Sequence, residues 1–250
     1  MARFLLFTGL FFILFTGFPA AAQKVKTDLS DKQKRCFSEK CRSLGLPNPQ
    51  FFYQNKININ EAAGFRKYGV DLQQMSRRWN GFTALEQVLL VPYLVKAKVV
   101  GIEEAPLGAG QFRVIYNVAV EETISGEKLP EKIEIYSRSA GNNGSFFSFN
   151  NEPVLQLGEE AVLYLSEFTI APQKQREKKA GEPVYEQISL KPDEKETKRV
   201  FVATLKYTSK NGQLFDAWNR PFAKEADFIR MAGNIYRLNK QKKFFSRSYC

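Results

Sequence analysis

Four segments with β character dominate the middle of the chain, between residues 93 and 168. They read YLVKAKVVGIEE, QFRVIYNVAVEETISGEK, EKIEIYSRS and EEAVLYLSEF, and turns rich in Gly, Pro and Ser separate them. In the first two, apolar residues alternate with charged ones, which is typical of strands with one buried face. Closely spaced strands of this kind predict a small closed barrel, and they do not by themselves indicate an activity.

The flanks of this block complete the predicted fold. A fifth strand is expected over 199–207, a helix over 222–239, and short helices within 51–92, where apolar residues recur every three or four positions. We therefore predict a mainly β protein with flanking helices, whose centre is a five-stranded OB-like barrel. Its parts are a signal peptide at 1–22, an N-terminal helical extension at 23–87, the barrel at 88–208 with a charged loop at 172–183, and a C-terminal helix and basic tail at 209–250.

The N-terminal residues predict export. Arg3 precedes the apolar run LLFTGLFFILFTGF, and Ala20 and Ala22 form an A-x-A cleavage pattern, so the mature chain is expected to begin at Gln23. The alternative is an uncleaved anchor, because the run approaches the roughly 20 residues that cross a bilayer. Pro19 favours cleavage. We expect a periplasmic or extracellular protein with no transmembrane span in its mature part.

The chain has no histidine and a formal net charge of +11. The missing histidine excludes Ser-His-Asp triads, Cys-His pairs and His-based metal sites, and no metal or cofactor is expected. The positive charge favours anionic partners such as an acidic envelope polymer, although solvated lysines alone also explain it.

Three cysteines are present, and Cys36 and Cys41 lie in a segment with helical character. On a continuous helix their Cα atoms would be roughly 8.6 Å apart, beyond the about 7 Å that a disulfide spans. Two alternatives remain open. Either the helix breaks and Cys36 pairs with Cys41, which is slightly favoured, or one of them pairs with Cys250.

Four cations occupy polar positions of the first three predicted strands: Lys96, Lys98, Arg113 and Lys132. They are the candidate binding residues, because cations on one face of a barrel can form a basic strip. A solvated barrel exterior gives the same pattern.

The sequence resembles that of a known family in four segments, AKVVGIEE, FRVIYNVAVEETISGE, KIEIYS and LQLGEEAVLYL. This order of strands and turns is similar to the barrel of tissue-inhibitor-of-metalloproteinase and netrin modules, as found in exported bacterial proteins. The resemblance covers about residues 88–208 and implies an OB-type fold. The animal inhibitors bind their target's metal through an N-terminal cysteine, whereas the mature chain here would begin with Gln23, so the resemblance implies the fold alone.

These features predict a non-catalytic binding or scaffolding protein of the cell envelope, with a protein or an anionic polymer as partner. A secreted inhibitor or an enzyme that works without histidine is one alternative. The other is OB-type nucleic-acid binding through a basic groove with stacking aromatic rings, which export disfavours. The sequence names neither the ligand nor the oligomeric state.

Overall fold

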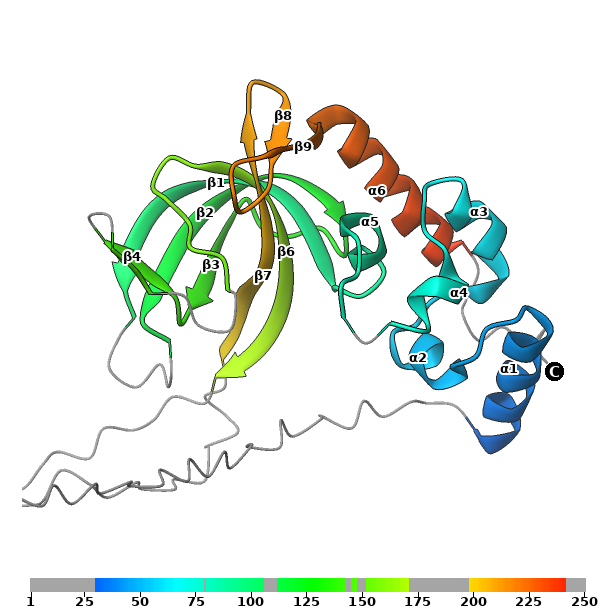
Figure 1. The fold of residues 1–250 in the computed structure, drawn as a ribbon. Helices are drawn as coiled ribbons and strands as arrows, with labels where there is room; N and C mark the ends of the chain where they lie inside the picture. Colours follow the sequence, from blue (N-terminus) through cyan, green and yellow to red (C-terminus); the bar gives the residue numbers. More distant parts are fainter. Residues whose placement is uncertain are drawn as a thin grey trace, which may run out of the picture.

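The computed structural model describes residues 30–78, 80–105, 112–142, 145–147, 152–170 and 198–241. The predicted signal peptide, the charged loop at 172–183 and most of the basic tail lie outside these ranges. Within them, a strongly curved and mainly antiparallel sheet of seven strands packs beside a group of helices (Figure 1). The mainly β fold with flanking helices is thus confirmed.

The sheet contains the predicted strands and two more. The predicted ones are β1 (Tyr93–Glu104), β2 (Val114–Ser125), β3 (Lys132–Ser137), β6 (Glu160–Ile170) and β7 (Lys198–Lys210). The additional strands β8 (Gln213–Phe215) and β9 (Pro221–Lys224) form a hairpin after β7, and β4 (Ala140–Asn142) and β5 (Ser145–Phe147) form a separate pair. The strand order is β3-β2-β1-β6-β7-β8-β9, and β3 also pairs with β7 in parallel, at Ile135 and Phe201.

The curvature follows from local irregularities in β1. Its pairing with β2 shifts register at three places, the last of them between Val99 and Gly101. Extra residues of this kind bend a strand and increase its twist. The inner face that results buries alternate residues of the strands, among them Val95, Ala97, Tyr116 and Val118.

The helices cover one end of the sheet. They are α1 (Asp31–Ser43), α2 (Pro49–Gln54), the 3-10 turn η1 (Ile59–Glu61), α3 (Ala62–Arg66), α4 (Leu72–Met75), α5 (Ala84–Gln87) and the C-terminal α6 (Glu225–Lys240). A second core joins them to the sheet, because Phe37, Phe52 and Phe228 pack in one cluster with Leu94 and Tyr164 of β1 and β6. The N-terminal helices therefore share a core with the strands.

Local residue patterns explain where several elements begin and turn. Thr83 and Glu86 form the reciprocal capping box at the start of α5. Asn211 and Gly212 have φ values of 51° and 73°, the left-handed conformation that a two-residue hairpin turn requires. The helix predicted over 222–239 begins three residues later, since its expected first turn is strand β9.

Candidate functional site

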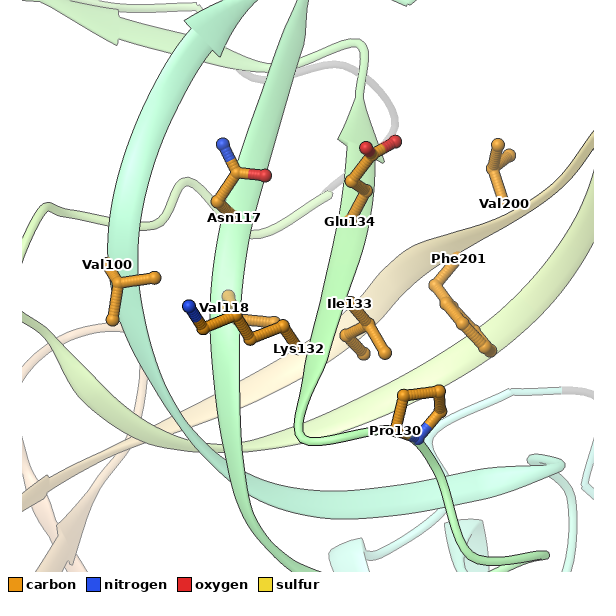
Figure 2. Close-up of a pocket in the computed structure, with 9 residues that line it drawn as sticks. All are labelled: Val100, Asn117, Val118, Pro130, Lys132, Ile133, Glu134, Val200 and Phe201. Atoms are coloured by element: carbon orange, nitrogen blue, oxygen red, sulfur yellow. The ribbon is translucent and has the colours of Figure 1, made fainter.

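A hollow of about 520 Å³ lies close to the place where β3 meets β7, and residues from both faces of the strands line it (Figure 2). Val100 comes from β1, Asn117 from β2, Lys132 and Glu134 from β3, and Phe201 from β7. A second hollow of about 700 Å³ shares Lys132 and continues along β2 and the connection to β3. We call the two together the β2–β3 groove.

Strand alternation explains why the groove holds polar groups. Ile133 and Ile135 point into the sheet core, so Lys132 and Glu134 point outward. The register shift after Val99 leaves Val100 half exposed, at 49%. The Asn117 amide donates a hydrogen bond to the Glu103 carboxylate. The groove therefore combines exposed apolar surface with fixed polar groups.

The four predicted cations do not form one strip. Lys98 and Lys132 lie in line across the sheet, on either side of β2, because both are paired in register with Ala119. Arg113 precedes β2, six residues before Ala119, which is roughly 20 Å along a strand. Lys96 is directed toward helix α6. Only Lys132 lines the groove.

Lys96 holds the sheet and α6 together. Its Nζ lies 2.9 Å from Glu225 Oε1 in the first turn of α6 and 3.4 Å from Glu121 Oε2 on β2. The hydrogen bond to Glu225 is the main reason that the pKa of Lys96 is raised above 10.5. Lys98, by contrast, forms an exposed ion pair with Glu160 at 3.0 Å. Lys96 is therefore a structural residue.

Carboxylates outnumber cations in the groove, a feature that the sequence analysis missed. Its lining includes Glu121, Glu122, Glu131 and Glu134 but only Lys128 and Lys132. Strand alternation places Glu121 on the polar face of β2 and Glu134 on that of β3, so the sequence pattern contained this information for two of the four acids. The groove has mixed charge with an acidic excess.

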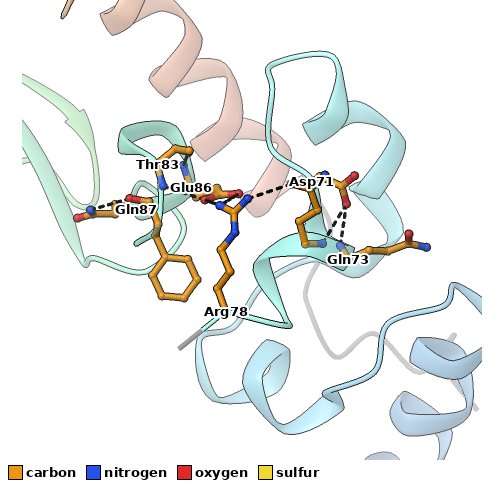
Figure 3. Close-up of polar contacts among 8 residues, drawn as sticks. Asp71, Gln73, Arg78, Thr83, Glu86 and Gln87 are labelled. Atoms are coloured by element: carbon orange, nitrogen blue, oxygen red, sulfur yellow. Dashed lines mark hydrogen bonds and ion pairs between the residues drawn. The ribbon is translucent and has the colours of Figure 1, made fainter. Parts of the chain in front are cut away.

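Three buried carboxylates outside the groove are paired with cations. Glu86, whose side chain is 3% exposed, lies 3.0 Å from Arg78 Nη1 and accepts the backbone N–H of Thr83 (Figure 3). Glu152 is paired with Arg138, and Lys206 Nζ lies 2.7 Å from Glu159 Oε1. These pairs connect separate elements of the fold, and a structural role accounts for each.

The prediction of a local disulfide between Cys36 and Cys41 is wrong. Cys41 is a free, buried thiol, whereas Cys36 is disulfide-bonded. The physical reason is helix geometry. Because α1 runs without a break from Asp31 to Ser43, the Cα atoms of the two cysteines stay too far apart for a disulfide. The other alternative involves Cys250, which lies outside the described residues. Burial raises the pKa of the Cys41 thiol from 9.0 to about 12.

Among the described residues, no group of three or more Cys, Asp or Glu side chains is placed to hold a metal ion. The helices in the same part of the chain are too short or too polar to cross a bilayer. Comparisons of the chain with protein families, with characterised proteins and with solved structures give no match.

Proposed function

We propose that this chain is an exported, non-catalytic binding protein of the cell envelope, built on an OB-like barrel. The order β3-β2-β1-β6-β7, with the parallel pairing of β3 and β7, supports the barrel, because it links the first and last of five strands. The N-terminal apolar run supports export. The resemblance to netrin-type modules agrees with both, and remains part of the proposal.

The β2–β3 groove is the proposed binding site, and its position is the observation that carries the proposal. OB-type barrels bind extended polymers across the outer face of their second and third strands, and here the groove lies over β2 and β3. Val100 and Phe201 give it an apolar part, and charged side chains surround them. Protein interfaces have this arrangement of an apolar centre and a polar rim.

The charge of the groove favours a protein partner over an anionic polymer. With four carboxylates against two lysines, the groove would repel phosphate groups, which nucleic-acid binding must neutralise. A basic peptide segment would instead meet complementary charge. We therefore propose that the groove binds an extended protein segment with at least one Lys or Arg.

Site-specific photo-crosslinking in the envelope tests this proposal. A photoreactive amino acid replaces Asn117 in one variant and Lys67, exposed on the helical side, in a control variant. We expect a discrete protein adduct at position 117 that is absent at position 67 and is lost when Val100→Asp is added. Equal adducts at both positions, or none at 117, would contradict a protein-binding groove.

Oligonucleotide binding by variants of the purified chain separates a protein-binding groove from a nucleic-acid-binding one. If the groove binds nucleic acid, oligonucleotide binding should fall when Lys132 is replaced by Gln and rise when Glu131 and Glu134 are replaced by Gln. We expect only the small change that follows from the altered net charge, because any residual attraction comes from the overall charge of +11.

A further inference from the structure

The β8–β9 hairpin follows β7 at the edge of the sheet (Figure 1), and Trp218 lies in the turn that joins its two strands. The side chain of Trp218 is 76% exposed, more than any other large hydrophobic residue in the described part of the chain. Phe222, on the following strand, is 43% exposed. The groove is formed by β1, β2, β3 and β7, so this hairpin is a separate surface.

The backbone fixes the conformation of the tip. Asp216 Oδ1 accepts hydrogen bonds from the N–H groups of Trp218 at 3.0 Å and Arg220 at 2.9 Å. The Asp216 N–H donates to the Arg220 carbonyl oxygen, and the Asn219 N–H donates to the Asp216 carbonyl oxygen. Asn219 has a φ of 57°, as expected of the residue that ends a three-residue hairpin turn. Trp218 is thus presented to solvent by an ordered turn.

A cation lies over the exposed Trp218 ring, and the hairpin as a whole is positively charged. Arg220 lies over the Trp218 ring, with its guanidinium carbon 4.8 Å from the centroid, and it is paired with Asp216 at 2.7 Å. From Lys210 to Lys224 the hairpin contains three cations, Lys210, Arg220 and Lys224, and one carboxylate, Asp216, so its net charge is 3 − 1 = +2. Phe222 stacks on Tyr207 at 4.4 Å, which anchors the aromatic surface in the fold.

We propose that the hairpin tip docks on the surface of an anionic lipid bilayer. Tryptophan favours the boundary between lipid and water because its ring has an apolar body and a polar N–H. Lysines beside it can place their apolar stems at the surface and their charges among anionic headgroups. The tip would hold the protein at the membrane while the groove on another face stays accessible.

Trp218 fluorescence gives a local test in the full chain. The chain has two tryptophans, so Trp79→Phe leaves Trp218 as the only emitter, and its thermal unfolding confirms that this variant is folded. On vesicles of equal parts phosphatidylcholine and phosphatidylglycerol we expect a blue shift and quenching by brominated lipid. Vesicles of phosphatidylcholine alone should give neither. Unchanged Trp218 emission on the anionic vesicles would overturn the proposal.

Vesicle flotation with variants tests the chemistry, with tryptophan retained at position 79. Trp218→Ala should weaken partitioning about tenfold, from the loss of buried apolar area, and Lys210→Gln with Lys224→Gln by about thirtyfold. The matched controls are Phe168→Ala, an exposed ring on β6 beside the start of β7, and Lys40→Gln with Lys67→Gln on the helical side. Equal losses in controls and hairpin variants, or a tip that captures an acidic protein but not vesicles, would overturn the membrane assignment. Groove crosslinking is a separate measurement, so either proposal can fail without the other.

Discussion

Lys96 and Lys98 lie two positions apart on the outer side of β1, yet their surroundings differ. Lys96 contacts Glu225 of α6 and Glu121 of β2 and is partly covered, whereas Lys98 is exposed and paired with Glu160 of β6. The same contrast extends to two larger regions. On the helical side, buried polar groups are paired across elements, and in the β2–β3 groove polar and apolar groups face solvent. A position's role in this protein depends on what covers it, not on its residue type.

The largest expected effect concerns Cys41 on the helical side. Because its pKa is raised to about 12 and the thiol is buried, the folded chain should react with iodoacetamide at pH 8.5 at least about a hundredfold more slowly than the unfolded chain. The reaction is followed by mass spectrometry without reductant, so that the disulfide-bonded Cys36 stays protected.

The groove supplies the control for that measurement. Val100→Cys places a thiol at an exposed position, and this variant should take up one label per chain at the rate of a free thiol. Rapid labelling of Cys41 in the unmodified chain would show that the helical side opens easily, and the proposed contrast between the two regions would fail.

The next effect concerns a buried carboxylate. Glu86→Ala should lower the free energy of unfolding by about 3 kcal/mol, because Arg78 loses its ion pair and the Thr83 N–H loses its acceptor. Glu131→Ala in the groove should change it by less than about 0.5 kcal/mol. Urea unfolding measures both. Similar losses for the two variants would show that the groove acids are also structural.

The sequence predicted the main strands well because apolar residues alternate in β1 and β2, and β6 has a continuous apolar run. All five predicted segments form strands, namely β1, β2, β3, β6 and β7. The β8–β9 hairpin was missed because its strands are only three and four residues long. Segments of that length carry almost no periodicity, and Phe222 also fitted the stripe of the following helix.

The site was less predictable, since it depends on register. Lys98 and Lys132 come together only because both are aligned with Ala119, and a bulge in β1 decides that alignment. The sequence likewise gave no indication that Glu225, 129 residues after Lys96, would neutralise it. Contacts at such separations arise from tertiary packing, which local patterns do not contain.

A smaller effect separates the two lysines of β1. Lys96→Met should lower the free energy of unfolding by about 1 to 2 kcal/mol, because it leaves Glu225 buried without its cation. Lys98→Met should change it by less than about 0.5 kcal/mol, as for other exposed ion pairs. Chemical unfolding at pH 7 compares the variants directly. Equal losses would remove the distinction between a structural and a solvated lysine.

The pH dependence of the same pair gives a second check. The folded pKa of Lys96 is raised above its usual 10.5, so the ion pair stabilises the fold fully below that pH. Its contribution falls as the pH rises from 10.5 through the folded pKa. The difference in stability between the original chain and Lys96→Met should therefore be constant up to about pH 10 and shrink above it.

The smallest effect is expected in the groove itself. Val100→Ala and Lys132→Ala remove side chains that are largely exposed, so each should change the free energy of unfolding by less than about 0.5 kcal/mol. The same substitutions should weaken the crosslink at position 117, since a binding surface can lose affinity without losing stability. A loss above about 1 kcal/mol would place these side chains among the packed groups of the fold. The groove would then resemble the helical side, and its assignment as a binding site would lose its basis.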